Sequence, residues 1–188
     1  MGKNGIVIVK DDSSESYHDT RLLMQLYRAT AFRAKHYEIV ARRYFENEYN
    51  CNITEFLDSV KQAGLNLNDD IQLIGCVDDV KYYQDKLAII ETNLKFIRDE
   101  YPDGERIYWT LYHTYVSRQK GGNAKIRADI SKVLDLSSVI SERTYRRWER
   151  KGMDILDYLL WGTSVYNEEL TEFLKNHAQE LIDSVTLY

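Results

Sequence analysis

The sequence is poor in the residues that break or cross-link a chain: its 188 residues include one proline, nine glycines and two cysteines. Proline ends or kinks helices and glycine supplies the tight turns of β-hairpins, so a shortage of both favours long helices. Cys51 and Cys76 lack metal-ligand spacing and give no disulfide framework. We therefore expect an all-α protein in a reducing, cytoplasmic setting.

Long apolar runs and catalytic motifs are also lacking. No window approaches the roughly 18 apolar residues of a membrane span, and the start, MGKNGIVIVK, has no signal-peptide pattern. The chain has no glycine-rich phosphate loop and no nucleophile elbow, and its four histidines are scattered. We therefore expect no enzyme activity, no cofactor, no metal and no membrane partner.

Charge is distributed unevenly along the chain. The net charge is −5, yet the segment from Arg118 to Lys151 holds ten Lys or Arg against four Asp or Glu, which gives +6 and leaves −11 for the rest. An acidic total excludes a uniformly basic coat. A local basic segment, in contrast, suits an anionic partner such as nucleic acid.

Apolar residues recur at helical spacing through most of the chain. The repeat between Val77 and Ile97 forms a seam that can pack within the chain or in a homodimer, and both alternatives stay open. The pattern predicts four parts: a polar segment at 1–16, a helical region with possible oligomerisation at 17–100, a helix-turn-helix module at 101–162 and an acidic amphipathic helix at 163–188.

The stretch ISERTYRRWERKGMD at 140–154 predicts an amphipathic helix with one strongly cationic side. At about 100° per residue, Tyr145, Trp148 and Gly152 fall on one face, which we expect to be buried. Ser141 precedes the first turn and can cap its free N–H groups. The opposite half carries the basic residues Arg143, Arg146, Arg147, Arg150 and Lys151.

The sequence predicts a short helix at 124–135, a connector and a longer helix starting near residue 141, which is the order of a helix-turn-helix. In that motif the second helix binds DNA, because a major groove about 12 Å wide admits one helix. We therefore predict binding to double-stranded DNA. Arg143, Arg146 and Arg147 are expected to face the groove. The residues expected at phosphates are Arg150, Lys151, Lys125 and Arg127, joined by the hydroxyls of Ser141 and Thr144.

The segment ISERTYRRWERKGMDIL resembles the recognition helix of ArpU-type phage and prophage transcriptional regulators, whose C-terminal module resembles region 4 of sigma factors. An Ile-Ser pair opens the helix, a Thr follows, and the inward positions match Tyr145, Trp148 and Gly152–Met153. With the preceding YYQDKLAIIETNLKFIRDEY and ERIYWTLYHTYVS, the resemblance covers about residues 80–161. It implies a sequence-specific regulator of phage late or lysis-related promoters, with DNA contacts from Arg143, Thr144, Arg146 and Arg147.

Other functions are compatible with the same sequence. A DNA-packaging protein of the small terminase type also joins a helix-turn-helix to oligomerising helices. A helical adaptor could bind RNA polymerase through its acidic helices, with or without DNA. The basic residues of 140–154 could also form an ordinary solvated face. The +6 segment favours DNA binding, because an adaptor alone has no need of it.

Overall fold

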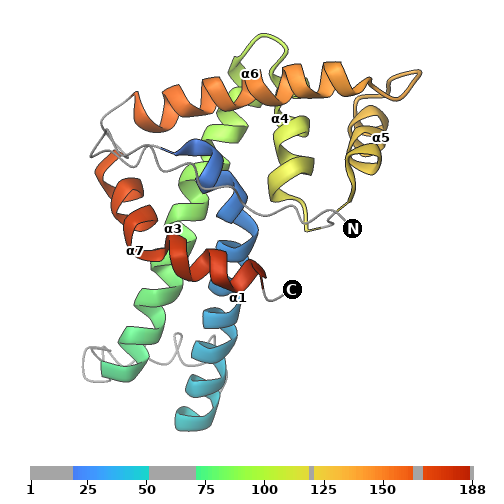
Figure 1. The fold of residues 1–188 in the computed structure, drawn as a ribbon. Coiled ribbons are helices and arrows are strands. Elements are labelled where there is room, and N and C mark those ends of the chain that lie inside the picture. Colours follow the sequence, from blue (N-terminus) through green and yellow to red (C-terminus); the bar gives the residue numbers. More distant parts are fainter. Residues whose placement is uncertain (1–18, 51–70, 119–120, 163–166, 187–188) are drawn as a thin grey trace. The chain divides into compact units, whose positions relative to one another are not determined.

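A computed structural model describes residues 19–50, 71–118, 121–162 and 167–186. These residues form helices, with no strand among them, which confirms the predicted all-α class for this part of the chain (Figure 1). The polar segment predicted at 1–16 lies outside the described residues. The chain divides into two compact units, unit 1 (1–29 and 89–188) and unit 2 (30–88).

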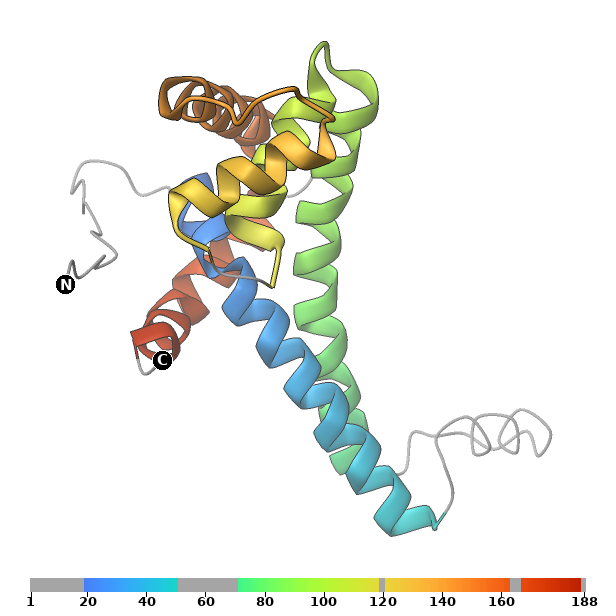
Figure 2. The same cartoon turned by 90° about the vertical axis from the view of Figure 1, so that its right-hand side faces the viewer.

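The described residues of unit 2 belong mainly to the later part of α1 (Thr20–Tyr49) and the earlier part of α3 (Ile71–Glu100), which lie side by side (Figure 2). The rings of Tyr37 and Tyr83 stack with centroids 5.6 Å apart and an interplanar angle of 12°. Phe45 is fully buried. Tyr83 belongs to the predicted apolar seam, so this position of the seam packs within the chain.

Unit 1 contains the N-terminal part of α1, the C-terminal part of α3 and the remaining helices. Helix α4 packs against both α5 and α6, and α5 also packs against α6 (Figure 1). The segment ERIYWTLYHTYV, which is part of the region that resembles the ArpU-type regulators, changes from α-helical to π-helical hydrogen bonding midway. The elements in order are α4 (Gly104–Leu111), the π-helix η2 (Tyr112–Val116), α5 (Asn123–Val133), α6 (Glu142–Trp161) and α7 (Asn167–Thr186).

All of the α-helices of unit 1 contribute buried apolar side chains. Burying one such side chain stabilises the fold by about 1.5–3 kcal/mol relative to leaving it in water. The helical spacing of these residues places them on one side of each helix, as the sequence pattern predicts. Fully buried examples are Leu23 and Leu26 in α1, Leu94 and Ile97 in α3, Ile107 and Leu111 in α4, Ile130 in α5, Leu156 and Leu160 in α6, and Phe173 in α7.

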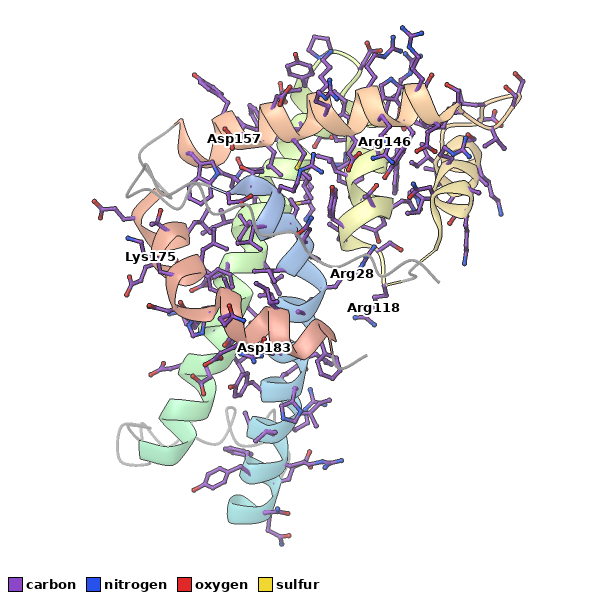
Figure 3. The ribbon with its side chains drawn as sticks, viewed as in Figure 1. Arg28, Arg118, Arg146, Asp157, Lys175 and Asp183 are labelled. Carbon is purple, nitrogen blue, oxygen red and sulfur yellow. The ribbon has the colours of Figure 1, made fainter. Side chains whose placement is uncertain are left out.

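Two close contacts fix α6 within unit 1. Gly152 allows α6 to approach α4, because a Cβ at this position would lie 2.8 Å from Ile107 Cγ2 and 2.9 Å from Leu111 Cδ1. At the C-terminal end of α6, Trp161 Nε1 donates a buried hydrogen bond of 2.7 Å to Thr20 Oγ1. The Thr20 hydroxyl in turn donates to Asp157 at 2.5 Å, which ties the first turn of α1 to α6 (Figure 3 shows Asp157).

The connection between α5 and α6 is ordered by backbone hydrogen bonds and one hydroxyl. Asp135 adopts a left-handed conformation with φ of 50°. The N–H of Leu136 donates to Ser131 O at 2.9 Å, as in a helix end with a left-handed residue after the cap. The Ser131 hydroxyl accepts from Ile140 N at 3.0 Å, nine residues further along. These hydrogen bonds fix the residues between the end of α5 and the start of α6.

A small apolar cluster joins α5 to α6. Ile126, Ile130, Ile140 and Tyr145 are its buried members. Trp148 packs against this cluster but stays partly exposed, so the prediction of a core position holds only in part for this residue. Leu134 occupies a similar place at the edge of the cluster.

Candidate nucleic-acid interface

Helix α6 begins at a capped N-terminus. The Ser141 side chain accepts a hydrogen bond from Thr144 N at 3.1 Å, which confirms the predicted cap. The two hydroxyl oxygens lie 3.0 Å apart and can bond to each other. Ser141 is exposed and Thr144 is half-buried. Both hydroxyls lie at the N-terminal end of α6, next to Arg143.

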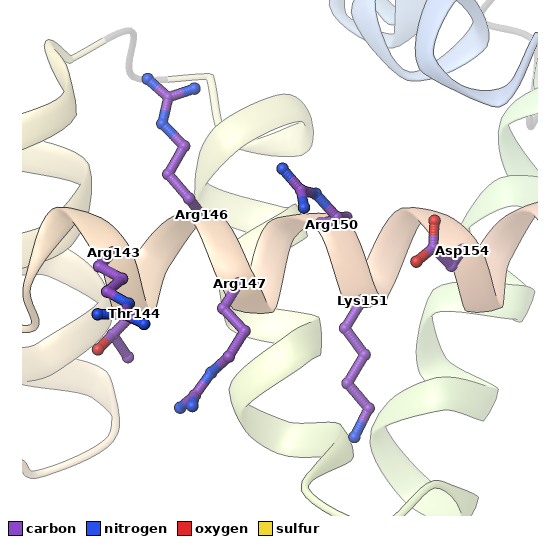
Figure 4. Close-up of a pocket in the computed structure, with 7 residues that line it drawn as sticks. All are labelled: Arg143, Thr144, Arg146, Arg147, Arg150, Lys151 and Asp154. Atoms are coloured by element: carbon purple, nitrogen blue, oxygen red, sulfur yellow. The ribbon is translucent and has the colours of Figure 1, made fainter.

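The five basic residues predicted for this helix are all exposed, and we call them the cationic face. Figure 4 shows Arg146 and Arg150 extending to one side of the helix, and Arg147 and Lys151 to the other. The side chains border a shallow concavity of about 540 Å³. Its lining consists of Arg143, Thr144, Arg146, Arg147, Arg150, Lys151 and Asp154.

One of the two acidic residues of this stretch is withdrawn from solvent. Glu149 is only 7% exposed and accepts a hydrogen bond of 2.6 Å from the Tyr115 hydroxyl. Burial and the neighbouring Glu149 raise the pKa of Tyr115, so its hydroxyl keeps its proton and remains a donor at neutral pH. From 142 to 151 Glu142 is then the single exposed acid, against five exposed bases.

Glu142 forms ion pairs at the start of α6. Its carboxylate lies 3.1 Å from Arg146 and 3.7 Å from Arg127 Nε. The Arg146 pair raises the pKa of that guanidinium. Arg127 also donates to Ile140 O at 3.1 Å, and its side chain is only 23% exposed. The structure therefore places Arg127, which the sequence assigned to a phosphate, in the link between α5 and α6.

The remaining cations differ in the contacts that their side chains make with neighbouring residues. The Lys151 ammonium lies 5.0 Å from the centre of the Tyr101 ring. Lys125, in the first turn of α5, is exposed, and its alkyl chain lies next to Gly121. Among the arginines of the cationic face, Arg143, Arg147 and Arg150 form no side-chain hydrogen bond and no ion pair with other described residues.

Sequence reasoning missed polar contacts made by the buried side of α6 and by the neighbouring η2. The Tyr145 hydroxyl lies 3.1 Å from Thr114 Oγ1, and burial raises the pKa of this tyrosine. Arg28 donates to Ser117 O at 2.7 Å and to Thr114 O at 2.8 Å, at the C-terminal end of η2 (Figure 3 labels Arg28). A cation there satisfies otherwise unpaired carbonyls and the negative end of the helix dipole.

The described residues hold no group of three His, Cys, Asp or Glu side chains that could bind a metal. None of their helices combines the length and the apolar character needed to cross a membrane. His113 lies in η2, where its Nε2 atom is buried without a hydrogen-bond partner among these residues. Burial lowers the pKa of His113, partly opposed by Asp129.

Comparison of the chain with protein-family models, with curated proteins and with solved structures found no match. The resemblance to ArpU-type regulators therefore stays a prediction. The charge and geometry of α6 are the basis on which a function is proposed.

Proposed function

We propose that the chain binds double-stranded DNA through the cationic face of α6 and acts as a sequence-specific transcriptional regulator. One observation carries the proposal: five exposed cations occupy the first three turns of α6, while Glu149 is turned into the core. An ordinary solvated helix face mixes charges of both signs. A surface of one sign fits a polyanion, because each neutralised phosphate releases a condensed counterion.

The arrangement of α5 and α6 supports DNA as the polyanion. Helix α6 has 20 residues, and with its side chains such a helix is about 10–12 Å across, close to the width of a major groove. In this proposal α5, the ordered connection after it and α6 act as a helix-turn-helix. The role as a regulator follows from the ArpU resemblance of the same segment.

A titration by fluorescence anisotropy tests DNA binding directly. Labelled duplexes of mixed sequence are titrated at 50 and at 200 mM salt. Binding that involves three phosphates should weaken about 40-fold over this range. Absence of binding at the lower salt concentration contradicts the proposal.

A pair of charge-matched variants assigns the binding to α6. The variant Arg147→Glu, Arg150→Glu should bind at least tenfold more weakly than the parent chain. The control Lys95→Glu, Lys175→Glu carries the same change of −4 on exposed residues of α3 and α7, so both variants move from −5 to −9. Arg146 is left intact because a glutamate there would face Glu142. Equal losses in both variants contradict a role of α6.

A further inference from the structure

Resting on the proposed DNA binding, we propose that the cationic face is divided into base-reading and phosphate-binding residues. Arg143, Arg147 and Arg150, here called the arginine stripe, contact guanine bases. Arg146 and Lys151 contact phosphates on the two sides of the stripe. This differs from the assignment made from sequence, which placed Arg146 in the groove and Arg150 at a phosphate.

The position of each residue around the helix gives the division. At about 100° per residue the three arginines of the stripe lie within about 60° of one another. Buried Gly152 and Leu156 lie on the opposite side of α6. Arg146 and Lys151 lie about 70° to either side of the midline of the stripe, in agreement with their opposite directions in Figure 4.

A helix that nearly fills the major groove presents different surroundings to these positions. The line opposite the protein core faces the floor of the groove, where the base edges are exposed. The two flanks face the phosphate backbones that form the groove walls. A cation on a flank therefore meets a phosphate before it meets a base, whereas the stripe points at the bases.

Existing contacts agree with this division. Arg146 is already paired with Glu142 at 3.1 Å, and Lys151 lies over the Tyr101 ring. A single contact with one phosphate oxygen is compatible with the Arg146–Glu142 pair and with the Lys151–Tyr101 contact. The arginines of the stripe form no ion pair or side-chain hydrogen bond with other described residues, so their planar donor pairs are free. Two parallel N–H donors match O6 and N7 of guanine, while adenine and cytosine each present an amino donor there.

The length of the stripe sets the size of the site. Seven residues separate Arg143 from Arg150, a rise of about 10 Å, which corresponds to roughly three steps between base pairs. Asp154 lies on the same line one turn later and carries the opposite charge. A carboxylate repels phosphates, so DNA contact ends near Asp154. The stripe therefore reads about four base pairs enriched in guanine.

The experiment compares lysine substitutions, which keep the charge and remove the planar donor pair. Duplexes selected from a random library by the parent chain are titrated beside a scrambled duplex. We expect Arg147→Lys to weaken binding to the selected duplex roughly 5- to 100-fold, and binding to the scrambled duplex at most about twofold. The flank control Arg146→Lys should change both by at most about twofold. Replacing guanine by 7-deazaguanine, which lacks N7, should reproduce the Arg147→Lys loss.

Three outcomes overturn the inference. If Arg146→Lys loses the preference for the selected duplex and Arg147→Lys retains it, the residues are assigned the wrong way round. If selection enriches no sequence, or 7-deazaguanine has no effect, the stripe does not read guanine although DNA binding stands. If the parent chain binds no duplex at 50 mM salt, the proposed function fails together with the inference. Circular dichroism of each variant checks that its fold is intact.

Discussion

Gly152 is expected to control the distance between α6 and α4, and replacing it by alanine measures how tightly the two helices pack. The new Cβ would lie 2.8 Å from Ile107 Cγ2, 2.9 Å from Leu111 Cδ1 and 3.0 Å from Leu111 Cγ. Both neighbours are at most 1% exposed, so they have little room to move. Overpacking of this kind costs about 1–3 kcal/mol. Alanine gains about 1 kcal/mol over glycine in a helix interior, and we expect a net loss of stability of about 1 kcal/mol.

A double-mutant cycle separates these two effects. Leu111→Ala removes the Cδ1 atom near Gly152, and by itself should cost about 2–5 kcal/mol. In that background Gly152→Ala loses part of its steric penalty and keeps its helix propensity. It should then be neutral or stabilising, which gives a coupling free energy of about 1–2 kcal/mol between the two sites.

Urea unfolding followed by circular dichroism and tryptophan fluorescence measures the four free energies of the cycle. A Gly152→Ala variant that is about 1 kcal/mol more stable than the parent would show that α6 does not approach α4 this closely. An equal effect of Gly152→Ala in both backgrounds would show that Leu111 is not the obstacle.

Further predictions concern the cap, the buried polar contacts and the cationic face. Asp135→Gly should raise the free energy of unfolding by about 0.5–1 kcal/mol in urea titrations, because φ at this position is 50°; a loss of stability contradicts this. Thr20→Val should cost about 1–3 kcal/mol because Trp161 Nε1 loses its 2.7 Å acceptor, whereas Thr20→Ser should cost less; equal costs would rule out the hydroxyl as the cause. Burial lowers the pKa of His113 below its ordinary 6.5, so its contribution to stability is complete above about pH 6.5 and is lost as the pH falls through the lower, folded value. Thermal melts between pH 5 and 7 should show a smaller acid loss for His113→Gln than for the parent chain, and identical profiles would contradict it. Lys151→Ala should weaken binding to all duplexes alike and lower the salt slope by about one unit; an unchanged slope would remove Lys151 from the phosphate contacts.

Local sequence patterns predicted the fold where one helix face decides the outcome. The short helix predicted at 124–135 is present as α5, and Ile126 and Ile130, four residues apart on one face, are both buried. Tyr145 and Gly152 were placed on the core side of α6 in the same way, and both are buried. Ser141 could be recognised as a cap because the residue type and the following turn are local signals.

Contacts between distant residues could not be predicted from one sequence. Arg28 lies 89 residues from Ser117, whose carbonyl it binds, and no local sequence pattern near either residue predicts this contact. The burial of Glu149 depends on a hydroxyl 34 residues earlier, that of Tyr115, and no local pattern connects these two residues. Arg127 carried the same local signal as a phosphate-binding arginine, but its position beside Ile140 and Glu142 follows from how α5 meets α6.

The ratio of two dissociation constants tests the central claim most directly. Anisotropy titrations at 50 mM salt compare Arg147→Glu, Arg150→Glu with Lys95→Glu, Lys175→Glu on the same duplex. Because the two variants have equal net charge, their ratio isolates the position of the charges from their number. We expect the dissociation constant of Arg147→Glu, Arg150→Glu to be about ten or more times that of the α3 and α7 control. A ratio near one would contradict DNA binding through α6.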